Sequence, residues 1–148
     1  MPYKEYQLVD YVLEVQAPAL YSVISTRPPT QHRRGHYTFR GRTPAIELTA
    51  LAALQFRSLS SKPGSAAPVG LYKAGAELNR TDSLLLPETE KVVAFYNGTI
   101  GRQDPIARFS ILLPGTDRDA FGLLDNATVI TYSDFDIRKP DERLILAH

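Results

Sequence analysis

Cysteine is absent from this sequence of 148 residues. Its absence excludes disulfide bonds, zinc–thiolate sites, iron–sulfur clusters and cysteine nucleophiles. The sequence also lacks any apolar run of about 18 residues, the length that a membrane span needs. Lys4, Glu5 and Asp10 interrupt the segment in which a signal peptide would be continuously apolar. We therefore expect a chain without a membrane span or a signal peptide.

Motifs for catalysis and cofactor binding are missing as well. The glycines are too scattered for a phosphate-binding loop, and there is no G-x-S-x-G sequence. His32 and His36 are four residues apart, but two arginines lie between them and no third ligand is evident, so we expect no metal and no cofactor. Asp134 and Asp136 alternate on an expected strand, where they form either a pair of catalytic acids or part of a solvated face.

What the sequence does contain is a repeated strand pattern. Short apolar runs, of which residues 6–15 are rich in β-branched and aromatic types, are mostly bounded by Pro, Gly, Asn or Asp and predict at least six strands. They fall at residues 6–15, 20–26, 36–40, 69–74, 91–96, 106–113, 128–137 and 143–147. We predict a mainly β fold class, an antiparallel sandwich or barrel, formed by a single β-rich domain over residues 1–148. Residues 16–42, which are rich in arginine, are expected to form an extended arm or long loop region.

One helix is predicted, near residues 44–59. Thr43 suits the N-cap, Pro44 the first helical position and Glu47 the first turn, and an Ala- and Leu-rich run follows. No other segment is expected to form a helix longer than two turns.

An internal similarity links residues 83–91 to residues 110–118, because five of the nine positions are identical in SLLLPETEK and SILLPGTDR. A duplication predicts equivalent strands at Leu84–Leu86 and Ile111–Leu113. Pro87 and Pro114 would then end sheet pairing, because proline cannot donate to a strand ladder. The alternative is a chance likeness between leucine-rich segments.

Charge is distributed unevenly although the net charge is only +1. Residues 1–76 carry nine Lys or Arg against four acids, a net +5, and residues 77–148 carry eight against twelve, a net −4. No acid lies between Glu14 and Glu47. Five arginines lie in that interval, interleaved with two aromatic residues, and these are the predicted partner-binding residues: Arg27, Arg33, Arg34, Arg40, Arg42, Tyr37 and Phe39.

Arginine suits planar, bidentate contacts with carboxylate or phosphate groups. The segment is therefore expected either to dock on an acidic surface of an adjacent protein chain or to hold a nucleic-acid backbone, with Tyr37 and Phe39 stacking on bases. We favour protein docking, because the rest of the chain is less basic than is usual for nucleic-acid binders.

By elimination, the sequence suggests a non-enzymatic structural subunit of a larger protein assembly. Its partners would be copies of itself and/or other subunits, with no membrane. The narrowest form of this hypothesis is a virion or phage accessory protein of the capsid decoration, cement or connector type, located in a virion or the cytoplasm. Two alternatives stay open: a nucleic-acid-binding module that uses residues 27–42, and an enzyme of unrecognised class that uses Asp134 and Asp136.

Overall fold

The computed structural model describes residues 8–25, 27–43, 48, 50–103, 105–114, 122–124, 128–130 and 135–147. The chain divides into two compact units: unit 1 comprises Met1–Gln55 and Leu124–Asn126, and unit 2 comprises Phe56–Leu123 and Ala127–His148. The elements of unit 1 are β1 (Val9–Gln16), β2 (Ser22–Ser25), β3 (Gln31–Arg33), β4 (His36–Thr43) and β5 (Ala50–Ala53). The elements that follow are β6 (Phe56–Ser60), β7 (Val69–Ala74), α1 (Arg80–Thr99), β8 (Phe109–Leu113), β9 (Gly122–Leu124), β10 (Thr128–Ile130) and α2 (Pro140–Ala147).

Unit 1 is built from antiparallel strands. Three of them form a sheet in the order β1-β4-β3, and β2 pairs with β5. Alternate residues of β1 are half-buried and exposed, as expected for a strand with one face on a core. The core of this unit contains Val23, Tyr37 and Phe39, with Leu13 and Val15 packed against it. The segment 16–42, predicted as an arm or long loop, thus contains β2, β3 and most of β4.

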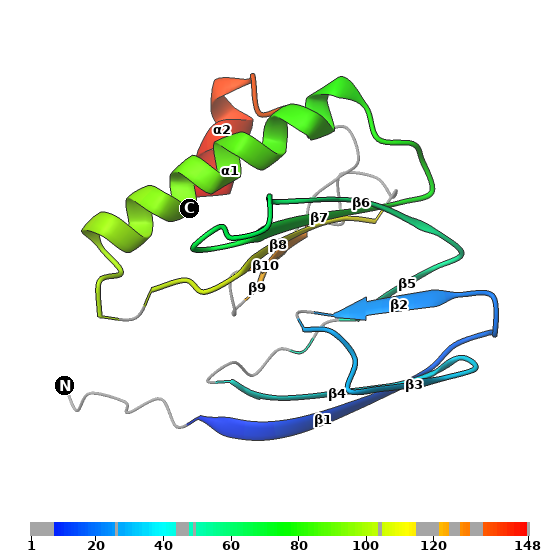
Figure 1. Ribbon diagram of the computed structural model, residues 1–148. Helices are drawn as coiled ribbons and strands as arrows, with labels where there is room; N and C mark the ends of the chain where they lie inside the picture. The colour runs from blue at the N-terminus through cyan, green and yellow to red at the C-terminus, as the bar shows by residue number, and fades with distance from the viewer. Residues whose placement is uncertain are drawn as a thin grey trace. The chain divides into compact units, whose positions relative to one another are not determined.

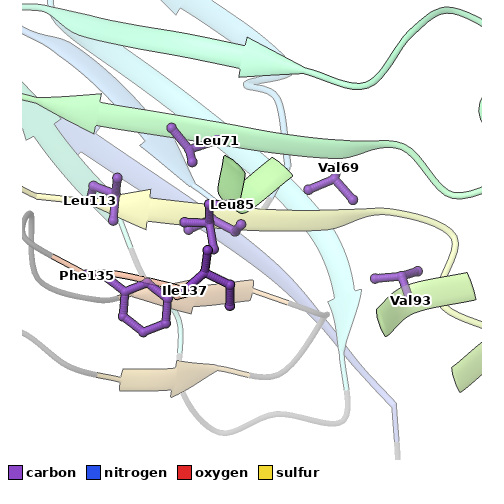
Figure 2. Packing of buried hydrophobic residues seen from close by; sticks show 8 residues of the cluster. Val69, Leu71, Leu85, Val93, Leu113, Phe135 and Ile137 are labelled. Atoms are coloured by element: carbon purple, nitrogen blue, oxygen red, sulfur yellow. The ribbon is translucent and has the colours of Figure 1, made fainter. Parts of the chain in front are cut away.

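Unit 2 has a five-stranded mixed sheet in the order β6-β7-β8-β10-β9. Strand β6 is antiparallel to β7, whereas β7, β8 and β10 run parallel. Parallel neighbours require a crossover connection, which α1 supplies between β7 and β8. Helix α1 lies across one face of this sheet (Figure 1). The buried cluster between them, part of which Figure 2 shows, consists of Val69, Leu71, Leu85, Val93, Ile111, Leu113, Phe135 and Ile137.

Helix α1 corrects the prediction of a strand at residues 91–96. It begins at Asn79, whose side chain accepts a hydrogen bond from the backbone N–H of Asp82, while the Asp82 carboxylate accepts one from the backbone N–H of Asn79. This capping box satisfies two backbone donors at the helix end. Leu85, Thr89 and Val93 then recur every four residues on the buried face. The buried residues of α1 therefore follow a helical period, whereas the short apolar run at residues 91–96 taken alone favoured a strand.

The prediction of a helix near residues 44–59 is wrong for its described part. Residues 50–53 and 56–60 are strands β5 and β6, while residues 44–47 and 49 lie outside the described residues. Burial alternates along β5, and Leu59 of β6 pairs with Leu71 of β7. The preference of Ala and Leu for a helix is less than about 1 kcal/mol per residue, so strand pairing overrides it.

The internal similarity is a coincidence of composition. Leu84–Leu86 lies inside α1, whereas Ile111–Leu113 belongs to β8. Pro87 is in the interior of the helix, and Pro114 directly follows the strand. The two segments therefore differ in secondary structure, and the duplication is excluded.

The prediction of a mainly β chain with at least six strands is confirmed, and the strand at 69–74 has the predicted bounds. Two details differ. The sheets are antiparallel in unit 1 and mixed in unit 2, and none of them closes into a barrel within the described ranges. Residues 143–147, predicted as a strand, belong to α2, which begins at Pro140 and carries Asp141 and Glu142 in its first turn.

Candidate functional site

Three of the five arginines share one face of the β1-β4-β3 sheet. Arg40 and Arg42 are two residues apart on β4 and so point to the same side. Arg33 of β3 lies opposite His36 of β4, which places it on that side too. All three arginines are exposed. We call the surface formed by Arg33, Arg40 and Arg42 the arginine face.

The other two arginines lie outside the strands. Arg27 is exposed and precedes the Pro28-Pro29 pair. Arg34 is in the two-residue turn between β3 and β4, with a φ of 35°, and Gly35 follows with a φ of 80°. Positive φ at both central residues is the signature of a type I′ turn, which suits the twist of a hairpin. The turn holds the exposed Arg34 side chain at the end of the sheet, beside Arg33.

The neighbours of the arginine face on β1 have mixed character. Asp10 lies opposite Arg42 and forms an ion pair with it, with 3.4 Å between the carboxylate oxygen and Nε. Val12 lies opposite Arg40, and Glu14 lies opposite Thr38. Among the described residues, Arg33, Arg34 and Arg40 form no ion pair. Their charges are therefore available to a binding partner.

The two aromatic residues of the predicted site lie on the opposite face of the same sheet. Phe39 is 0% exposed and Tyr37 is 6% exposed. The Tyr37 ring stacks on His32, with 4.1 Å between ring centroids, and its hydroxyl donates to the carbonyl of Tyr21. Strand alternation thus separates residues that are interleaved in the sequence. Tyr37 and Phe39 pack the core of unit 1, while the arginines face outward.

Alternation also separates the two histidines that were considered as metal ligands. His32 lies opposite Tyr37 and stacks on it, whereas His36 lies opposite Arg33 on the arginine face. Over the part of the chain that the structure describes, no group of three His, Cys, Asp or Glu residues could hold a metal ion. His32 and His36 therefore lie on opposite faces of the sheet, and they do not form the pair of ligands on one face that the four-residue spacing would give on a helix.

Of the predicted acidic pair, Asp134 lies outside the described residues and Asp136 is half-buried before α2. The Asp136 carboxylate accepts bonds of 2.8 Å from Nε and from Nη2 of Arg138, and a third bond from the Arg138 backbone N–H. These bonds lower the pKa of Asp136 to about 2. The carboxylate is therefore ionised and fully engaged at neutral pH, which does not suit a proton-transfer role.

One ion pair in unit 2 was not predicted from the sequence. Lys73 of β7 and Asp82 of α1 are joined by 2.8 Å between Nζ and a carboxylate oxygen, with side chains only 4% and 2% exposed. The same carboxylate oxygen accepts from the Asn79 N–H. Because both ends of the pair are covered and bonded, it ties the start of α1 to the sheet. In the sequence, the Asn-x-x-Asp spacing typical of a capping box indicates the helix start at which Asp82 lies.

Comparisons with known proteins do not assign a function to this chain. No protein-family model matches the chain, and no curated protein matches it. Within the described ranges, neither α1 nor α2 is a long apolar helix of the kind that crosses a membrane.

Proposed function

We propose that this chain is a non-enzymatic subunit of a larger protein assembly and that it contacts its partner through the arginine face. The observation that supports this function is the exposure of Arg33 and Arg40 on paired strands, where neither has an ion pair among the described residues. Arginines on a rigid sheet lose less conformational freedom on binding than arginines on a loose arm. The face is therefore suited to binding acidic groups.

A nucleic-acid-binding role for residues 27–42 is the alternative that uses the same arginines. Two observations favour protein over nucleic acid. Asp10 and Glu14 share the face with the arginines and would repel phosphates. Tyr37 and Phe39 are buried, so their rings are not available as a platform for bases.

The enzymatic alternative rests on Asp134 and Asp136. The engagement of Asp136 with Arg138 gives that alternative no support. A virion or phage accessory role, of the capsid decoration, cement or connector type, is the narrow form of the proposal. It is supported only by the β-rich fold and the size of the chain, and detection of the chain in purified particles would test it.

The test of the general proposal is the size at which the chain migrates in a native extract, with and without nuclease. We expect the full chain to elute in a particle several times its own mass, and we expect nuclease to leave that particle intact. Elution as a free monomer would overturn the proposal. Release of the chain by nuclease, with a steep loss of binding as salt rises, would establish the nucleic-acid alternative instead.

A further inference from the structure

We infer that the arginine face and the adjacent Arg34 bind an extended acidic segment of a partner protein, with the partner's carboxylates bound by Arg33, Arg34 and Arg40. This inference rests on the proposed function and names the chemistry of the partner. Among the described residues, the arginines of this face and Arg34 form no ion pair apart from the one between Arg42 and Asp10. Charge complementarity therefore calls for acids on the partner.

The register of the sheet sets the spacing that the partner must match. Arg33 lies opposite His36, and Arg40 is four residues further along β4. At about 3.4 Å per residue, the two ends of this row are about 13–14 Å apart. An extended segment has the same rise per residue and the same alternation, so acids four residues apart in it would reach both ends. Arg34, in the turn beyond Arg33, can bind a further acid at the end of the segment.

The surroundings of the row favour a protein segment over a polyphosphate chain. Val12 is exposed opposite Arg40 and provides an apolar contact that phosphates cannot use. Glu14 lies opposite Thr38, midway between the two ends of the row. A continuous phosphate backbone would meet Glu14 with like charge, whereas a protein segment can place a neutral residue there.

A second copy of this chain is a less suitable partner. The acids of unit 2 described here are largely used within the chain: Glu77 pairs with Arg57, Glu88 with Lys91, and Asp136 with Arg138. Among the acids of unit 2 that the structure describes, these pairs leave few carboxylates free for the arginine face of another copy. The occupant to which we commit is therefore an acidic segment of a different protein.

The test uses a synthetic peptide of about ten residues in which every fourth residue is glutamate and the others are threonine, so that the acids share one side of an extended chain and a neutral residue faces Glu14. Its binding to the full chain is measured by fluorescence anisotropy against the same peptide with glutamine for glutamate. We expect binding of the glutamate peptide alone. Replacing Arg33→Gln together with Arg40→Gln should weaken that binding about tenfold, since each exposed pair contributes a modest part.

A charge-matched control separates the arginine face from general attraction. Arg80→Gln with Arg108→Gln removes two exposed arginines of unit 2 and should leave peptide binding unchanged. Equal loss in both double variants would overturn the inference, and so would equal affinity for the glutamine peptide. A preference for a single-stranded oligonucleotide over the glutamate peptide would overturn it in favour of nucleic acid.

The outcome for the peptide and the outcome for the native particle are independent. If the Arg33→Gln, Arg40→Gln variant no longer binds the peptide but still elutes in the large particle, these arginines do not hold the partner. That result would overturn this inference while leaving an assembly role in place. Peptide binding that depends on these arginines, in a chain that migrates as a free monomer in native extract, would overturn the proposed function while supporting the carboxylate site.

Discussion

Gly35 decides whether the hairpin between β3 and β4 can close. It has a φ of 80°, its carbonyl accepts a bond of 2.8 Å from the Ala17 N–H, and a Cβ at this position would lie 2.2 Å from the carbonyl oxygen of Ala17. Such a contact is with backbone, which cannot move aside as a side chain would. Both backbone conformation and space therefore require glycine here.

Gly35→Ala should destabilise the chain by about 2 kcal/mol or more, since the left-handed conformation alone costs about 1 kcal/mol for alanine and the clash adds to it. Gly64→Ala is the matched control, because Gly64 has a φ of 89° and a Cβ added there would meet nothing within 4 Å. Urea unfolding should show the larger loss for Gly35→Ala. Equal losses would show that the Ala17 contact is unimportant.

The carboxylate of Asp136 gives the chain a defined acid dependence. Its bonds to the Arg138 side chain lower its pKa from 3.8 to about 2. A carboxyl with a lowered pKa contributes stability that is present above its unfolded pKa and is lost as pH falls through its folded pKa.

Asp136→Asn should therefore lower the melting temperature relative to the unchanged chain by a constant amount above about pH 5. The difference should shrink as pH falls from 3.8 toward about 2, where the native carboxyl becomes protonated. Thermal unfolding across this pH range measures it. A difference that is the same at every pH would contradict the assigned bonds.

Among the secondary-structure elements, α1 depends at its start on the buried pair of Lys73 and Asp82. Replacing one partner leaves the other buried without a counter-charge, a loss of about 3–5 kcal/mol in comparable pairs. Asp82→Asn should therefore be strongly destabilising in urea unfolding. Adding Lys73→Met should recover part of the loss, because an apolar side chain of similar length needs no counter-charge.

An exposed pair provides the contrast for this experiment. Glu77 and Arg57 are 2.6 Å apart, but their side chains are 79% and 41% exposed. Glu77→Gln should cost no more than about 1 kcal/mol. If Glu77→Gln were as damaging as Asp82→Asn, burial would not be the source of the effect.

Pro87 is the residue of α1 that opposes the helix. It lies in the helix interior, where it has no N–H to donate to the Ser83 carbonyl. Alanine is preferred over proline there by about 3 kcal/mol, offset by about 0.4–1 kcal/mol because proline stiffens the unfolded chain. Pro87→Ala should raise the melting temperature. Pro105→Ala, outside any helix or strand, should not raise it, and a loss of stability in Pro87→Ala would contradict this account.

For the molecule as a whole, the exposed arginines should affect assembly without affecting folding. Arg33→Ala with Arg34→Asn removes two charges, and asparagine tolerates the positive φ of residue 34. We expect thermal unfolding to change little and the native particle to become smaller in size-exclusion chromatography. Loss of folding in this variant would mean that the two arginines act within the chain.

Features that depend on neighbours along the chain could be read from residue order. The mostly apolar run at residues 69–74 formed the predicted strand, because its side chains suit a strand that is buried on both faces. The Asn79-x-x-Asp82 spacing marks the start of α1 in the sequence, since a capping box involves only nearby backbone, although no helix was predicted there. The interval between Glu14 and Glu47, which has five arginines and no acid, was likewise visible in the residue order.

Which residues share a surface, in contrast, depended on contacts between distant parts of the chain. Pairing of β5 with β2 and of β6 with β7 made strands of an Ala- and Leu-rich segment, since partners far along the chain outweigh small local preferences. Packing in unit 1 turned Phe39 inward and Arg40 outward, although they are adjacent in sequence. The physical reason is that a strand alternates its side chains, while the position of the core sets which side is covered.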